Sequence, residues 1–306
     1  MAYTATDVKN LREQTGAGMM DCKKALDETT GDFQKAVDYL RAKGLAAAAK
    51  KQSRIATEGT VLAVVKGKQA SLVEVNSETD FAGKSPDFLN FAATAANVAV
   101  EGGYNDIEQL LAAKAANGSA LKDMISELTI KIGEKIDVRR LETVKLAGNG
   151  LIGSYVHSGK IGVLCVIESD KDVATNEAVK DLAKDLCMQI AAANPTFLNA
   201  NEIDEAFKAR EAEVYAAQLK EQGKPEAMIP NIVKGKLNKL ASDVCLYEQS
   251  FVKDPDTTVA KLIETVGKTA GAALKVTKFV KFNLGEGLQK KEENFADEVA
   301  KMTGHN

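Results

Sequence analysis

Tryptophan is absent from the 306-residue chain, histidine occurs only twice, and aromatic residues make up 5% of the total. His157 and His305 are too few for a typical zinc site or for several catalytic dyads. The four cysteines are scattered and form no Cys-x-x-Cys pair. We therefore expect them to be small buried apolar residues in a reducing compartment, and we expect neither a metal nor a cofactor.

Long apolar runs and a strong charge of one sign are also missing. No segment approaches the roughly 20 apolar residues of a membrane span, and the first nine residues lack the apolar core of a secretion signal. The net charge is −3 and the isoelectric point is about 5.7. Without a global basic field, nucleic acid is not expected as a partner. The sequence therefore predicts a cytoplasmic protein that binds neither membrane nor nucleic acid.

The N-terminal region, residues 1–54, has the pattern of three short helices. Thr6 is a candidate cap for the first helix, and Gly16 is the residue expected to end it. In the third helix, apolar residues recur at the spacing of one helix face from Phe33 onward. Because 306 residues are many for one compact core, we expect further domains after this module.

Residues 55–147 begin with a β-hairpin pattern that turns at Gly67-Lys68. An acidic connection and a helix opened by Ser85-Pro86 follow, and Asn105 is a candidate cap for a further short helix. Hairpin, acidic connection and helix recur roughly ninety residues later, within 148–284. The sequence therefore predicts two similar core subdomains, built from antiparallel sheets and helices.

Two further helical pieces complete an α+β architecture. Residues 202–242 form two helical segments joined at Gly223-Lys224, which predicts a projecting antiparallel hairpin that could meet a partner or a second copy of the chain. Residues 285–306 contain a final amphipathic pattern capped by Asn294, and we assign them to a C-terminal helical module.

The connection after the first hairpin places an acidic residue beside a large aromatic one, Asp80 and Phe81. One interpretation is that Thr79 or Asp80 caps a helix while Phe81 folds into the core. The other is that the pair is a probe for insertion into another surface. A similar argument applies to Met19 and Met20, because adjacent residues do not share a helix face and at least one should be exposed.

Gly148 to Gly153 spells G-x-G-x-x-G, the pattern of a dinucleotide-binding loop. That loop must open a helix whose N-terminus faces the pyrophosphate, whereas this segment runs into a strand pattern. Gly267-Lys268-Thr269 ends like a phosphate loop but has Leu262 where the first glycine belongs. A dinucleotide-dependent oxidoreductase is therefore kept only as the alternative function, and direct nucleotide binding is not expected.

Four segments, in order, resemble signatures of the elongation factor Ts family. The resemblance is carried by Thr15 to Leu26 (TGAGMMDCKKAL), Glu74 to Phe81 (EVNSETDF), Lys131 to Glu134 (KIGE) and Gly153 to His157 (GSYVH). Phe279 to Gly287 resembles the C-terminal part of the family. The family usually has Val-Ala after the Asp-Phe pair, where this chain has Ala82-Gly83, and glycine adds backbone freedom.

The resemblance implies a guanine-nucleotide exchange factor for elongation factor Tu that performs no covalent chemistry. It implies a ubiquitin-associated-like N-terminal module that grips the partner's GTPase domain. It also implies a segment that displaces the partner's Mg²⁺, namely Asp80, Phe81, Ala82 and Gly83. The remaining partner contacts implied by the resemblance are Arg12, Met19, Met20, Lys23, Ile132, Gly133, His157 and Val233. An adaptor that acts through residues 1–54 alone is a third interpretation.

Overall fold

The computed structural model describes residues 3–15 and 17–289 of the chain. The predicted helix end at Gly16 and the C-terminal helix from Asn294 lie outside these residues. The helices are α1 (Ala5–Thr15), α2 (Met19–Glu28), α3 (Phe33–Lys51), α4 (Asp80–Gly83), α5 (Pro86–Gly102), α6 (Ile107–Ala112), α7 (Leu121–Ile132), α8 (Glu177–Ala193), α9 (Glu205–Glu221), α10 (Ile229–Val244) and α11 (Val259–Ala270), with short 3₁₀ turns η1 (Ala200–Glu202) and η2 (Glu226–Met228). The strands are β1 (Glu58–Lys66), β2 (Gln69–Ser77), β3 (Ile136–Lys145), β4 (Asn149–His157), β5 (Ile161–Ser169), β6 (Ser250–Phe251), β7 (Asp254–Thr258) and β8 (Leu274–Asn283).

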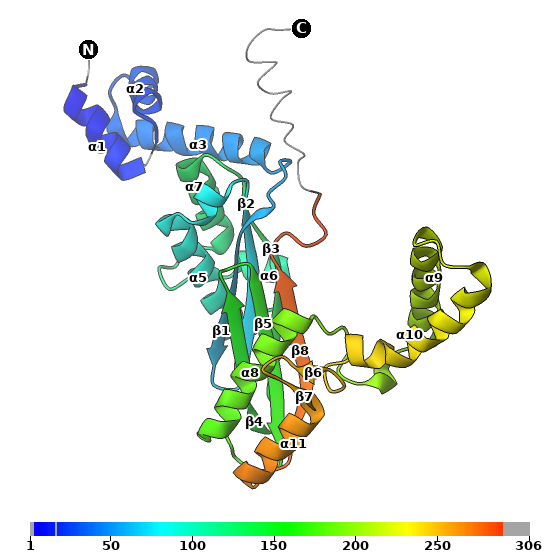
Figure 1. Cartoon of the computed structure of the whole chain (residues 1–306). Helices are drawn as coiled ribbons and strands as arrows, with labels where there is room; N and C mark the ends of the chain where they lie inside the picture. Colours follow the sequence, from blue (N-terminus) through cyan, green and yellow to red (C-terminus); the bar gives the residue numbers. More distant parts are fainter. Residues whose placement is uncertain (1–2, 16, 290–306) are drawn as a thin grey trace.

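The strands of the described residues form antiparallel sheets in the orders β1-β2-β3, β4-β5-β8 and β6-β7. Figure 1 shows the two larger sheets as one elongated body, with α1 to α3 at one end and α9 and α10 projecting from the side. The predicted fold class, helices combined with antiparallel sheets, is confirmed.

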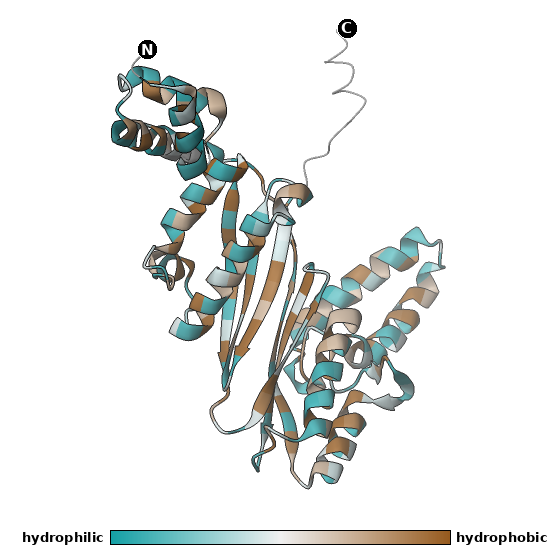
Figure 2. Ribbon diagram, turned by 90° about the vertical axis from the view of Figure 1, so that its left-hand side faces the viewer, coloured by the Kyte–Doolittle hydropathy of each residue, from teal (hydrophilic) through white to brown (hydrophobic). Residues whose placement is uncertain are grey.

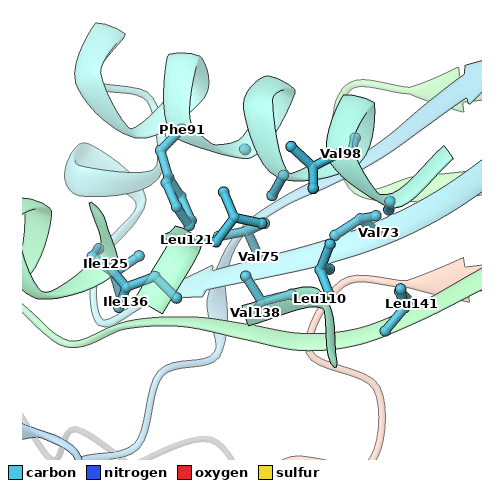
Figure 3. Packing of buried hydrophobic residues seen from close by; sticks show 14 of the residues in the cluster. Val73, Val75, Phe91, Val98, Leu110, Leu121, Ile125, Ile136, Val138 and Leu141 are labelled. Carbon is cyan, nitrogen blue, oxygen red and sulfur yellow. The ribbon is translucent and has the colours of Figure 1, made fainter. Parts of the chain in front are cut away.

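Strand β2 is buried on both faces because it lies between two apolar layers. Val73 and Val75 point into the cluster formed with α5, α6 and α7, whereas Leu72 points to the opposite face. Figure 3 shows Val73, Val75 and Val138 of the sheet packed beneath Phe91 and Val98 of α5. This alternation follows from the two-residue period of side chains along a strand.

Strand β5 repeats the arrangement in the second half of the core. Val163 and Ile167 pack beneath α8 and α11, and Leu164 and Val166 point to the other face. There they meet Leu72 and its neighbours from the first sheet. The two sheets therefore pack face to face with helices on the outer faces, as Figure 2 also shows.

A buried carboxylate joins the two halves of the core. The side chain of Glu74 on β2 is fully buried and accepts hydrogen bonds from Arg139 and Arg140 of β3, at 2.9 and 2.6 Å, and from the Gly285 N–H beyond β8, at 2.9 Å. Burial opposes ionisation of Glu74, but the Gly285 N–H and both guanidinium groups outweigh it and hold its pKa below the ordinary value.

The N-terminal helices pack around Leu11, Leu26 and Leu40, and Cys22 lies in the same cluster. All four cysteines are buried, as expected from the sequence. At the start of α1 the predicted cap, Thr6, is wrong. Thr4 is the cap, because its hydroxyl accepts the Asp7 N–H while the Asp7 carboxylate accepts the Thr4 N–H.

The predicted cap of α6 is also wrong, and two elements of the second half were not predicted. Asn105 does not cap α6. Its side chain pairs with the backbone of Thr143 on β3, and Asp106 caps the helix by accepting the Gln109 N–H. Helix α11 and the small β6-β7 hairpin were not predicted. Gly267-Lys268-Thr269, which resembles part of a phosphate loop, lies inside α11.

Candidate functional site

The connection between β2 and α5 contains a one-turn helix, α4. Thr79 caps it, since its hydroxyl accepts the Ala82 N–H at 3.3 Å. Ser85 then caps α5 by accepting the Phe88 N–H at 3.4 Å, with Pro86 at the first turn. The proposed cap at Thr79 is thus present, but the aromatic residue after it does not fold inward.

Phe81 is 85% exposed, which makes it an unusual position for so large an apolar side chain. The residues after it face the other way. Ala82 and Gly83 are buried, and a Cβ built on Gly83 would lie 3.0 Å from the Gly59 Cα at the start of β1. Because a helix turns about 100° per residue, pressing Ala82 and Gly83 onto the sheet directs Phe81 outward.

Asp80 lies beside Phe81 and is half-exposed. Its carboxylate accepts a hydrogen bond from the Lys84 ammonium at 2.6 Å, and this hydrogen bond holds the pKa of Asp80 below its ordinary value. The carboxylate at the tip of the connection is therefore ionised at neutral pH, next to an exposed aromatic ring.

The end of α7 meets the same connection. Ile132 closes α7, and Gly133 caps it with a φ of +84°, a conformation that glycine adopts without strain. The Lys51 ammonium at the end of α3 donates to the Gly133 carbonyl at 2.6 Å. The structure thus brings Gly133 to the last residue of α3, and the next residue, Glu134, accepts hydrogen bonds from Thr79 at the start of α4.

The predicted contact residues of the N-terminal module are all on its surface. Arg12 lies on α1, and Met19, Met20 and Lys23 lie on α2. The side chains of Met19 and Met20 are 47% and 73% exposed, so both methionines are available for contact. From the sequence, at least one of the two was expected to be exposed, because adjacent residues do not share a helix face.

His157 ends β4, and its ring nitrogen lies 3.0 Å from the Tyr155 hydroxyl. The following turn is tied to the start of β1 by a hydrogen bond from the Val61 N–H to the Gly159 carbonyl at 2.7 Å. Gly59, two residues before Val61, packs against α4. The structure therefore places the His157 turn and α4 at the same end of the core.

Val233 is half-buried on α10 in the projecting hairpin, apart from this end.

Two carboxylates that hold α4 were missed by the sequence analysis. Glu78 precedes α4 and Glu134 follows α7, and each accepts hydrogen bonds from the segment that carries the other. They are separated by 56 residues in the chain, so no local pattern could pair them. The fourth residue of the KIGE signature was the only signal that pointed to Glu134.

The glycine pattern of Gly148 to Gly153 does not open a helix. It runs into β4, and a Cβ on Gly153 would lie 2.8 Å from the Ala183 carbonyl oxygen of α8. This glycine permits close packing of helix on strand, and the context that a dinucleotide loop needs is missing. Among residues 3–15 and 17–289, no cluster of three or more metal-ligating side chains occurs, and no helix is long and apolar enough to span a bilayer.

Comparison with known proteins agrees with the signatures. The family model described as elongation factor TS matches residues 78–286. Elongation factor Ts of Clostridium perfringens is 47% identical over 304 residues, which cover 98% of this chain and 99% of that protein. The proteins of the same name from Clostridioides difficile and Magnetococcus marinus are 48% and 45% identical, covering 98% and 99% of this chain and 98% and 99% of their own lengths. The chain therefore belongs to the elongation factor Ts family, whose members are nucleotide exchange factors and not catalysts of covalent chemistry.

Proposed function

We propose that the chain binds elongation factor Tu carrying GDP and accelerates GDP release by inserting α4 beside the nucleotide site. The observation that carries the proposal is the 85% exposure of Phe81 on a short helix whose other face is packed against β1. A large, stiff side chain on a supported turn is suited to displacing part of another protein, because little of the applied force is lost in bending the turn.

The chemistry of the step follows from how a GTPase holds GDP. The phosphates bind to a phosphate loop and to Mg²⁺, which requires nearly ideal octahedral geometry. Phe81 displaces the elements around the ion, and the ionised Asp80 reorders polar groups next to it. The metal then loses ligands, the phosphates lose their main counter-charge, and GDP leaves faster. GTP, which is free in solution, then takes the empty site.

Exchange also requires that the factor and the nucleotide weaken each other's binding by the same factor. A typical allosteric coupling of roughly 1–3 kcal/mol changes affinity only about 5–150-fold, so an efficient exchange factor should exceed this range. Anchoring contacts away from the nucleotide supply the affinity that keeps the complex together during the exchange. We assign them to Arg12, Met19, Met20 and Lys23 of the N-terminal module.

Further contacts are assigned to other parts of the chain. Ile132 and Gly133 directly precede Glu134, which binds Thr79 at the start of α4, and the His157 turn lies at the same end of the core, so we assign all three to one contact surface. Val233 on the projecting hairpin would touch a second region of the partner. Pairing of two copies through 202–242, action in the cytoplasm and the absence of nucleic-acid binding stay predictions, as does the division at residues 54, 147 and 284.

The test is release of fluorescent GDP from elongation factor Tu in the presence of Mg²⁺. The purified chain should accelerate release in proportion to its concentration until the partner is saturated, and excess Mg²⁺ should oppose the acceleration. Release at the spontaneous rate at every concentration of the chain would exclude the proposal. Calorimetry with NAD or NADP tests the alternative, which requires saturable binding of the dinucleotide to the chain alone.

A further inference from the structure

Two carboxylates, Glu78 and Glu134, lie at the base of α4, and each accepts a hydrogen bond from the chain segment that carries the other. The Thr79 N–H donates to Glu134 Oε2 at 2.9 Å, and the Lys135 N–H donates to Glu78 Oε1 at 2.6 Å. Each carboxylate thus binds the backbone of the residue that follows the other one. We call this reciprocal arrangement of Glu78, Thr79, Glu134 and Lys135 the clasp. It joins the chain before α4 to the chain after α7.

Glu134 also determines what the Thr79 hydroxyl can do. The hydroxyl donates its only proton to Glu134 Oε1 at 2.7 Å, which leaves its lone pairs for the Ala82 N–H. The cap of α4 is therefore oriented by Glu134. A helix of four residues has almost no stability of its own, because nucleation is unfavourable and no propagation follows. The direction of Phe81 then depends on the contacts at the base of α4.

The clasp is also connected to the N-terminal module. Arg54, in the segment between α3 and β1, donates to both oxygens of Glu78 at 3.2 and 3.3 Å. Lys51 at the end of α3 holds the Gly133 carbonyl, next to Glu134. The proposed anchoring module and the proposed wedge are consequently fixed at one junction, so a partner held by the first meets the second in a defined position.

We propose that Glu134 is a positioning residue for exchange: through the Thr79 hydroxyl and N–H it holds α4 so that Phe81 points at the partner. This role rests on the proposed function, because Phe81 is the group that acts. Glu134 itself need not touch the nucleotide site. Its removal should therefore lower the rate of GDP release inside the complex while leaving the affinity of the complex unchanged.

Glu134→Ala removes both hydrogen bonds to Thr79, and Thr79→Val removes the hydroxyl but keeps the N–H. Because hydrogen bonds to a charged group are involved, each variant should lower the maximal rate of GDP release about tenfold. The concentration of factor giving half-maximal release should not change. The double variant should lose little more than Glu134→Ala alone, since both act through one contact. Thr79→Ser should retain the wild-type rate.

Glu127→Ala, which removes an exposed carboxylate from α7, the helix that precedes Glu134, is the matched control and should behave as wild type. A second readout needs no partner: hydrogen exchange at the Ala82 N–H should be faster in Glu134→Ala and in Thr79→Val. Wild-type maximal rates in both variants would overturn the role of Glu134 but not the proposed function. Fully multiplicative losses in the double variant would do the same. A wild-type chain that fails to stimulate release would overturn the proposed function and this role with it, and the Ala82 exchange rates would still report on the clasp.

Discussion

In each half of the core a connection follows the β-hairpin, and the two connections differ in how far their side chains are exposed. After β2 the apolar residue of the connection, Phe81, is 85% exposed, whereas after β5 the corresponding apolar residue, Val173, is 3% exposed. Both connections lead into a capped helix, by Ser85 in the first half and by Asn176 in the second. The exposure of Phe81 is therefore not a consequence of the topology that the halves share.

The acidic residues of the two connections differ in the same way. Asp170 accepts the Ala273 N–H at 2.7 Å and so fastens its connection to the strand β8 region of the same half. Asp80 instead pairs with Lys84 on its own turn, at the surface. The connection after β5 uses Asp170 and Val173 for contacts within its own half. The connection after β2 presents Asp80 and Phe81 outward, and its base is fixed by Glu78 and Glu134. We therefore expect the outward-facing connection, the one between β2 and α5, to contact another molecule.

The comparison assumes that both halves belong to one packed body, and Glu74→Ala tests this most severely. Removing the carboxylate leaves Arg139 and Arg140 without their buried partner, which typically costs about 3–5 kcal/mol of unfolding free energy. Glu142→Ala is the control, because Glu142 joins the same two sheets through an exposed ion pair with Lys278 at 2.6 Å and should cost less than about 1 kcal/mol. Urea unfolding would measure both, and equal losses would contradict the account.

The same buried carboxylate predicts a pH dependence. The folded pKa of Glu74 lies below its unfolded value, so its contribution to stability is present above the ordinary carboxyl pKa and is lost as pH falls through the lowered folded pKa. Acid unfolding of Glu74→Gln should lack this part of the pH dependence.

The next test compares how much Val173 and Phe81 each contribute to the free energy of unfolding. Val173→Ala removes buried apolar surface and should lower the unfolding free energy by about 1.5–3 kcal/mol. Phe81→Ala removes a larger side chain but one that is mostly in water, so its effect should stay within about 0.5 kcal/mol. Denaturant titrations followed by circular dichroism give both values. A Phe81→Ala variant as destabilised as Val173→Ala would mean that the ring packs inside the protein.

Packing beneath α4 is tested by a smaller change. A Cβ on Gly83 would meet the Gly59 backbone at 3.0 Å, so Gly83→Ala should lower stability by about 1 kcal/mol, the low end for added volume in a packed site. On α10, a Cβ on Gly235 would meet no atom within 4 Å, and Gly235→Ala should raise stability by about 1 kcal/mol through helix propensity. Increases of the same size for both variants would show that α4 is not pressed onto β1.

The smallest expected effect concerns the surface pair at the tip. Lys84→Ala should raise the pKa of Asp80 toward the ordinary carboxyl value, because the hydrogen bond from Lys84 is the main cause of its lowering. In the second half, Lys268→Ala should do the same to Glu264 on α11. Carbon-detected NMR titrations would measure both carboxyl groups. A pKa of Asp80 that does not respond to Lys84→Ala would point to another interaction at the tip.

Much of the fold could be predicted from local patterns. Both long hairpins and the helix opened by Ser85-Pro86 follow from strand alternation and cap residues. The caps at Thr6 and Asn105 were wrong for different reasons. Thr4 forms a reciprocal local pair with Asp7, whereas Asn105 is held by the backbone of Thr143 and leaves the cap to Asp106.

The candidate site was less accessible to local reasoning. Asp80-Phe81 fitted both a cap with a buried ring and an exposed probe, and the choice depends on the packing of Gly83 on Gly59 and on the contacts of Thr79 with Glu134. Glu134 is 55 residues from Thr79, and such a pair leaves no periodic trace in a single sequence. The resemblance to a family located the segment, whereas its support could be found only in three dimensions.

The most direct measurement of the central claim is the rate of GDP release from elongation factor Tu saturated with Phe81→Ala. The account predicts a fall on the order of 30-fold, as for loss of a contact worth about 2 kcal/mol, with little change in the concentration needed for saturation. Leu89→Ala, which removes another exposed apolar side chain near the start of α5, should release GDP at the wild-type rate. A wild-type rate for Phe81→Ala at saturation would contradict the account.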